Sequence, residues 1–111
     1  MIQIISLHAM AWCKPCQQFA PVMEAIRKEE KYNVFNFRVY DIDTDEGFEI
    51  CEKYHVRSVP TTLITEEDGE EIYKIVGATS KANVEQILDS VLKQDKERQK
   101  ENKTDNNAKE E

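Results

Sequence analysis

The run Ile2-Gln3-Ile4-Ile5-Ser6-Leu7 constrains the fold more than any other feature of the sequence. It is nearly continuously apolar and rich in β-branched residues. This composition is typical of a strand that is buried on both of its faces, as in sheets with parallel strands. We therefore expect residues 2–7 to form a central parallel strand.

The next segments alternate between helical and extended patterns. Between residues 13 and 30, apolar residues recur at spacings of three and four, which predicts a helix with one buried face, and Pro21 within it predicts a kink. Residues 34–42 read as a second strand, and the acidic stretch after it leads into a short helix around residues 48–54. This βαβα order implies a right-handed crossover between parallel strands.

The following segments predict a hairpin and one more helix. Residues 61–65 and 71–76 read as strands joined through Asp68-Gly69, a dipeptide typical of tight turns, so this pair should be antiparallel. A last helix is expected to begin near Ser80 as N-cap and to cover the sheet with an apolar face.

Length and charge define the broad class of protein. A chain of 111 residues that is 40% hydrophobic suits one domain, which we assign to residues 1–94. Residues 95–111 lack apolar anchors, so we expect a frayed helix end and a disordered tail. Residues 93–111 hold six basic and six acidic side chains, against nine and sixteen in residues 1–92. No basic stripe is left for nucleic acid.

The start of the chain shows neither a charged leader nor a long apolar run. We therefore expect a cytoplasmic protein that does not bind a membrane. The chain has three cysteines, which is a small and odd number for a secreted protein held together by disulfides. We therefore expect the thiols to have a chemical rather than a structural role. We expect a monomer.

Cys13 and Cys16 form a Cys-x-x-Cys motif. This motif supplies half of the ligands of a common type of zinc site, and it is also the active-site motif of thiol–disulfide oxidoreductases. At a strand-to-helix junction, unpaired N–H groups and the positive helix end would stabilise a Cys13 thiolate. Lys14 adds a cation, and Pro15 suits a helix start. One helical turn brings Cys16 back toward Cys13, which allows a dithiol cycle with a redox-active disulfide and no bound cofactor.

The zinc alternative would add Cys51 and His55, whose spacing occurs in helical metal sites. Nothing in the expected fold brings this pair to Cys13 and Cys16, so we expect no metal. Cys51 itself suits a small buried helix residue. The acidic residues between 41 and 46 lack the spacing of a calcium loop and are expected to form a solvated turn that caps a helix.

Several motifs taken together resemble the thioredoxin family. They are Trp12-Cys13-Lys14-Pro15-Cys16 followed by Pro21, Val56-Arg57-Ser58-Val59-Pro60-Thr61, Asp68-Gly69, and Val76-Gly77-Ala78. Their order and spacing are similar to those of the family over residues 2–92. The resemblance implies an α/β thioredoxin-like fold, βαβαββα, with a four-stranded mixed sheet and helices on both faces.

The resemblance also implies the activity and the docking site. The chain would reduce protein disulfides by attack of Cys13 and resolution by Cys16, with a thioredoxin reductase-like electron donor. Val59-Pro60 would be a cis peptide that faces Cys13 and, with Thr61, holds substrate backbone. Trp12 would shield the cysteines, and Gly77 would either border the binding groove or only end a strand. Glutathione-linked glutaredoxin activity and disulfide isomerase activity are the alternatives.

The sequence departs from the family at two places. The family's usual first strand and helix are missing. A buried aspartate that the family places six residues before its first cysteine is replaced by Leu7, and its lysine partner by Val39. His8, which should point to the opposite face from Leu7, is a candidate proton acceptor for Cys16, or else a structural histidine.

Overall fold

The computed structural model describes residues 1–110, and the side chains of residues 1–96. The elements follow the order β1 (Gln3–His8), α1 (Lys14–Arg27), a 3-10 turn η1 (Glu30–Tyr32), β2 (Asn36–Asp41), α2 (Asp45–Lys53), β3 (Thr61–Thr65), β4 (Glu71–Val76) and α3 (Lys81–Glu110). This is the predicted βαβαββα order, with η1 as an added turn.

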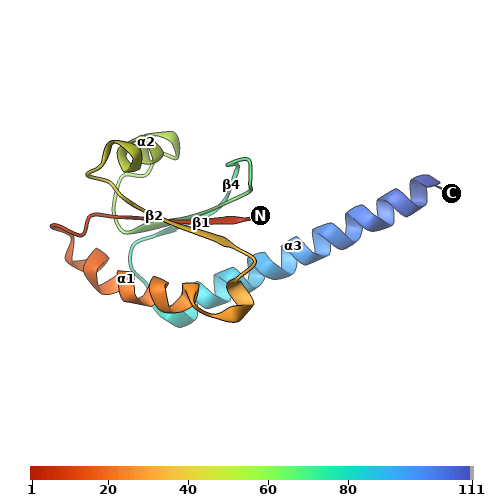
Figure 1. Ribbon diagram of the computed structural model, residues 1–111, viewed down its shortest axis with the longest axis horizontal. Coiled ribbons are helices and arrows are strands. Elements are labelled where there is room, and N and C mark those ends of the chain that lie inside the picture. Colours follow the sequence, from red (N-terminus) through yellow and green to blue (C-terminus); the bar gives the residue numbers. More distant parts are fainter. Residues whose placement is uncertain (111) are drawn as a thin grey trace. The chain divides into compact units, whose positions relative to one another are not determined.

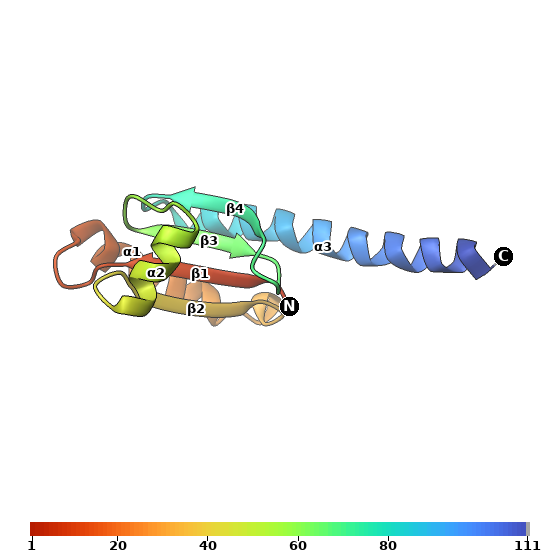
Figure 2. The same ribbon diagram turned by 90° about the horizontal axis from the view of Figure 1, so that it is seen from above.

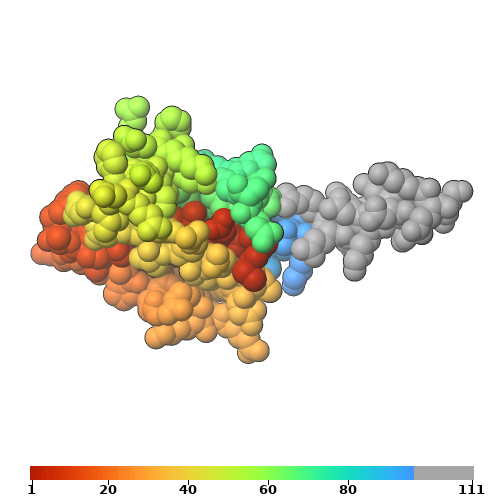
Figure 3. Space-filling view, turned by 45° about the horizontal axis from the view of Figure 1, so that its top comes forward, coloured from red at the N-terminus to blue at the C-terminus, as the bar shows by residue number. Residues whose placement is uncertain are grey.

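The sheet has the strand order β2-β1-β3-β4. β1 is parallel to β2 and antiparallel to β3, and β3 and β4 form an antiparallel hairpin. The predicted central position of β1 and the predicted pairings are therefore confirmed. β2 is an edge strand, and the space-filling view shows it at the surface between α1 and α2 (Figure 3).

The helices α1 and α2 cover opposite faces of the sheet (Figures 1 and 2). Ile5 and Leu7 of β1 pack with Leu63 of β3 and with apolar side chains of α2 and its flanking loops. Because successive side chains of a strand point to opposite faces, Ser6 and His8 face α1 instead. Leu7 is therefore on the side of α2, and the opposite orientation of His8 follows from the same alternation.

The parallel pairing of β1 and β2 brings the loops after both strands to the same edge of the sheet. The backbone N–H of Ile42 donates to the carbonyl oxygen of His8 at 2.8 Å, which extends the pairing to the start of the loops. Thr44 caps α2 by accepting a hydrogen bond from the N–H of Gly47 at 3.1 Å, and Asp45 occupies the first turn. The cap is therefore Thr44 rather than one of the acidic residues, whereas Asp45 and Glu46 lie in the first turn, where the acidic stretch was expected to favour the helix.

The chain divides into a compact unit over Met1–Thr79 and a second unit that begins at Ser80 and contains α3. The Ser80 hydroxyl accepts a hydrogen bond from the N–H of Asn83 at 3.1 Å, so Ser80 is the predicted N-cap. Packing of α3 on the sheet stays a prediction.

α3 runs to Glu110, through most of the segment predicted to be a disordered tail. Between residues 95 and 110, this segment holds four Lys and three Glu, which favour helix. The boundary between a domain ending at residue 94 and a separate tail stays a prediction. Residue 111 and the side chains of residues 97–110 lie outside the part of the chain that the structure describes. Within the described part of the chain, no helix has the length and apolarity needed to cross a membrane.

Candidate active site

Cys13 occupies the N-cap of α1, directly before Lys14 and Pro15. Its backbone is extended, with φ −96° and ψ 104°, and its sulfur accepts a hydrogen bond from the N–H of Cys16 at 3.2 Å. The sulfur thus takes the place of the oxygen of a usual N-cap side chain. A helix N-terminus of this kind favours negative charge on the capping atom, and therefore the thiolate of Cys13.

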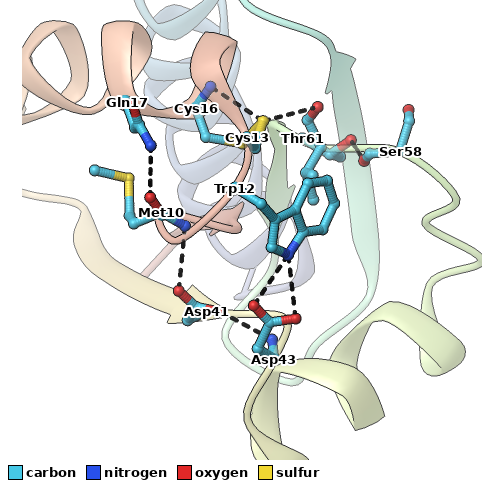
Figure 4. Close-up of a disulfide and its surroundings, with 10 residues drawn as sticks. Met10, Trp12, Cys13, Cys16, Gln17, Asp41, Asp43, Ser58 and Thr61 are labelled. Carbon is cyan, nitrogen blue, oxygen red and sulfur yellow. Dashed lines mark hydrogen bonds between the residues drawn. A yellow bond between two sulfur atoms is a disulfide. The ribbon is translucent and has the colours of Figure 1, made fainter.

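Cys13 and Cys16 are joined in a disulfide, with their Cα atoms 5.2 Å apart (Figure 4). They form a small cluster with Ala9, against which Ile42 and Val59 pack. Cys13 is 5% exposed and Cys16 only 1%. Cys16 is therefore the more deeply enclosed of the two sulfur-bearing residues, while Lys14 and Pro15 at the helix start are exposed.

The loop before β3 lies against the cysteines. The Val59-Pro60 peptide bond is cis, as the resemblance implied. The Cys13 Sγ atom lies 3.7 Å from the carbonyl oxygen of Val59, so a Cys13 thiol in the reduced form could donate to it. Thr61 donates its hydroxyl to the carbonyl oxygen of Ser58 at 2.8 Å, which fixes the loop from within.

Gly77 adjoins this loop at the end of β4. Its N–H donates to the carbonyl oxygen of Pro60 at 2.8 Å, so it borders the cis-proline segment. Its φ is +88°, a region that L side chains rarely adopt. Apart from its two neighbours in the chain, no described residue has a heavy atom within 4 Å of the point that a Cβ would occupy. Backbone conformation, rather than crowding, therefore explains the glycine.

Trp12 is 62% exposed, and its indole N–H donates to Asp43 Oδ2 at 3.1 Å (Figure 4). Asp41 binds the same two loops, because its carboxylate accepts from the N–H groups of Met10 and Asp43 at 3.3 and 2.9 Å. Sequence reasoning missed both contacts by assigning these acids only to a solvated turn. The available signal was the parallel pairing of β1 and β2, whose carboxyl ends meet at one edge.

The four side chains of the zinc hypothesis are not gathered in one place. Cys13 and Cys16 are bonded to each other, whereas Cys51 in α2 packs against the cluster around Leu7 and Leu63. Among the residues with described side chains, no group of three or more potential metal ligands forms. Burial raises the pKa of the Cys51 thiol, which disfavours its thiolate.

Leu7, at the position of the family's aspartate, is 1% exposed and lies in the apolar cluster under α2. The register pairs Leu7 with Tyr40, and Val39 with Ser6. Val39 therefore does not face Leu7, because side chains alternate along β2 and Val39 is turned toward α1. The assignment of Val39 to the position of the family's lysine stays a prediction.

The fold and this site define a thiol–disulfide oxidoreductase: a disulfide at a helix start lies beside a cis-proline loop in a four-stranded mixed sheet. The thioredoxin family model matches residues 3–90. The chain belongs to the thioredoxin family.

Relatives of known sequence and structure agree with this assignment. Thioredoxin of Staphylococcus aureus (strain Mu50) is 34% identical over 91 residues, which cover 82% of this chain and 83% of the relative. The crystal structure of thioredoxin from Trypanosoma brucei brucei is similar at a TM-score of 0.71 and 26% identity, over 84% of this chain and 76% of that one. The crystal structure of thioredoxin NaTrxh from Nicotiana alata is similar at a TM-score of 0.65 and 29% identity, over 78% of this chain and 70% of that one.

Proposed function

We propose that the chain reduces protein disulfides through a dithiol cycle of Cys13 and Cys16. The observation that carries this proposal is the position of the Cys13 sulfur, which caps α1 and accepts the N–H of Cys16 at 3.2 Å. That position favours the thiolate of Cys13, which is the attacking form. The adjacent Lys14 adds a positive charge at the same helix start.

The cycle has two exchange steps that conserve electrons. The Cys13 thiolate attacks a substrate disulfide, forms a mixed disulfide and releases one substrate thiolate. Cys16 then loses its proton and attacks the Cys13 sulfur, which forms the Cys13–Cys16 disulfide and releases the second substrate thiolate. The substrate gains two electrons, and a reductase must return two electrons to the protein. We propose a thioredoxin reductase-like donor.

The substrate is proposed to dock on the surface formed by Trp12, the segment Val59-Pro60-Thr61, and Gly77. The contact of 3.7 Å between Cys13 Sγ and the Val59 carbonyl oxygen supports this assignment, because a backbone held along that loop would lie beside the attacking sulfur. The exposed face of Trp12 supplies apolar area next to it. We further propose that the protein acts as a cytoplasmic monomer.

Reduction of insulin disulfides by variants of the three cysteines tests the proposal. We expect Cys13→Ser to abolish turnover, Cys16→Ser to accumulate a mixed disulfide that mass spectrometry detects, and Cys51→Ser, the matched control, to keep activity within about twofold. A mixed disulfide that forms on Cys16 in Cys13→Ser, with none on Cys13 in Cys16→Ser, would reverse the roles. A mixed disulfide on Cys51 would remove the assignment. Turnover with glutathione but not with a thioredoxin reductase would establish the glutaredoxin alternative, and reshuffling without net reduction the isomerase alternative.

A further inference from the structure

A cavity of about 410 Å³ lies between α1 and the face of the sheet that carries Ser6 and His8. Its walls are mostly apolar and include Phe19 and Phe37, and it reaches Cys16 and Pro60 at one end. The cavity therefore runs along the inner side of the redox site, on the face of the sheet opposite to α2.

The proposed cycle needs a proton acceptor on this side. Cys16 is 1% exposed and must lose its thiol proton when it attacks the mixed disulfide. Bulk water reaches so enclosed a thiol poorly, but the cavity is also lined by the polar residues Ser6, Gln17 and Thr62. Such groups can hold water, and one water needs only about 10–15 Å³ of space. Proton transfer from Cys16 into the cavity thus has a physical route.

His8 is the candidate base along this route from Cys16 into the cavity. It is half-buried at the end of β1, and it is one of the residues that line the same cavity as Cys16. Within the residues whose side chains are described, the imidazole forms no hydrogen bond, which leaves its ring nitrogens available to water. A neutral imidazole accepts a proton readily near neutral pH.

The charged groups around His8 come from two elements. Asp41 of β2 is its register partner, and its carboxylate is bound by the N–H groups of Met10 and Asp43. From α1, Glu24 and Arg27 line the cavity and are paired with each other, which lowers the pKa of Glu24. Glu24 is therefore the weaker base, and the wall formed by residues 60–62 adds no charge.

We propose that His8 accepts the proton of Cys16 through water in this cavity during resolution of the mixed disulfide. The S–H bond of Cys16 breaks, the new bond between the sulfurs of Cys16 and Cys13 forms, and the bond from Cys13 to the substrate sulfur breaks. The substrate leaves as a thiolate, and the proton rests on His8 until solvent or that thiolate takes it. This role rests on the proposed dithiol cycle.

Stopped-flow reaction of the reduced protein with dithiobis-nitrobenzoate separates the two steps, because attack by Cys13 and resolution by Cys16 each release one coloured thiolate. Variants are made in the Cys51→Ser background, so that only the redox pair reacts. The sequence holds two histidines, so His8→Gln has a matched control in His55→Gln. Circular dichroism checks folding, and His8→Asn is a second variant for the same measurement.

We expect His8→Gln to leave the first phase unchanged and to slow the second about tenfold at pH 7, a modest value for a general base. His55→Gln, the matched control, should leave both phases unchanged. The difference between His8→Gln and the unaltered protein should shrink as the pH rises, because hydroxide can then take the thiol proton of Cys16 directly.

Two results would overturn the role of His8. An unchanged second phase in His8→Gln and His8→Asn would assign the proton to the departing thiolate, and an equal slowing at every pH would indicate a structural effect. Failure of the dithiol cycle itself looks different, because the unaltered protein would then lack the second release altogether, and the role of His8 would fall with it.

Discussion

The indole N–H of Trp12 donates to Asp43 at 3.1 Å, although 31 residues separate them in the chain. Trp12 precedes the redox pair after β1, and Asp43 follows β2 just before α2. The bond therefore joins the loop that holds the attacking cysteine to the loop that begins α2. It gives an exposed aromatic side chain one orientation at the edge of the proposed docking surface.

Replacement of Asp43 by Asn should loosen Trp12 without removing a large side chain. We expect an increase of a few-fold in the KM for a protein disulfide, and a loss of stability below about 1 kcal/mol because the bond is exposed. Trp12 is the single tryptophan, so its fluorescence anisotropy reports its mobility directly. Asp45→Asn, in the first turn of α2, is the control, and unaltered anisotropy in Asp43→Asn would contradict the prediction.

The thiol of Cys51 should react slowly with alkylating reagents at neutral pH. Burial raises its pKa, so the fraction of thiolate at pH 7 is lower than in an unfolded peptide, and it should approach the peptide value only as the pH rises. In the reduced protein, limiting iodoacetamide should label Cys13 before Cys51, as peptide mass spectrometry can measure. Labelling of Cys51 as fast as in the urea-unfolded chain would disprove this.

Gly47→Ala should destabilise the protein even though alanine favours helices. A Cβ at this position in α2 would lie 2.0 Å from the backbone carbonyl oxygen of Asp41, and backbone cannot move aside cheaply. We expect a loss of about 1–3 kcal/mol in the free energy of unfolding, typical of an overpacked site. Urea denaturation measures it. Glu46→Ala, one position earlier and exposed, should change stability by less than about 0.5 kcal/mol.

Local sequence patterns predicted much of the fold and part of the candidate active site. The hairpin strands were predicted at their observed bounds, residues 61–65 and 71–76, because Asp68-Gly69 marks their turn. Cys13 was predicted at a helix start because Pro15 and the apolar spacing indicate one. The bond from Trp12 to Asp43 was not predicted, since it depends on how two distant loops meet once β1 and β2 are paired.

Register between strands is equally non-local. The sequence suggested that Val39 replaces a lysine beside Leu7, but a shift of one residue along a strand reverses the face on which a side chain lies. The observed register turns Val39 toward the cavity by α1 and sets Tyr40 beside Leu7. The face on which Val39 lies thus follows from the register between β1 and β2, which a resemblance between motifs does not contain.

Leu7→Asp tests how the apolar cluster under α2 tolerates the acid that other family members carry there. Leu7 is 1% exposed and packs with Ile5 and Leu63, so a carboxyl group would lose both solvation and apolar contacts. We expect destabilisation of about 3–5 kcal/mol from the lost packing and the buried polar group. The carboxyl should remain largely protonated, with a pKa raised above its unfolded value of about 3.9.

That raised pKa fixes the sign of the pH dependence in Leu7→Asp. Below the unfolded pKa, the group is neutral in both states and adds no electrostatic penalty to folding. As the pH rises from about 4 through the raised folded pKa, the unfolded state ionises first and the variant loses further stability. Leu7→Asn has nearly the same shape but does not titrate, so the difference between the two variants in urea denaturation should widen between about pH 4.5 and about pH 8. An equal difference at both pH values would show that the aspartate reaches solvent or a cation, and that the cluster around Leu7 is less enclosed than the packing indicates.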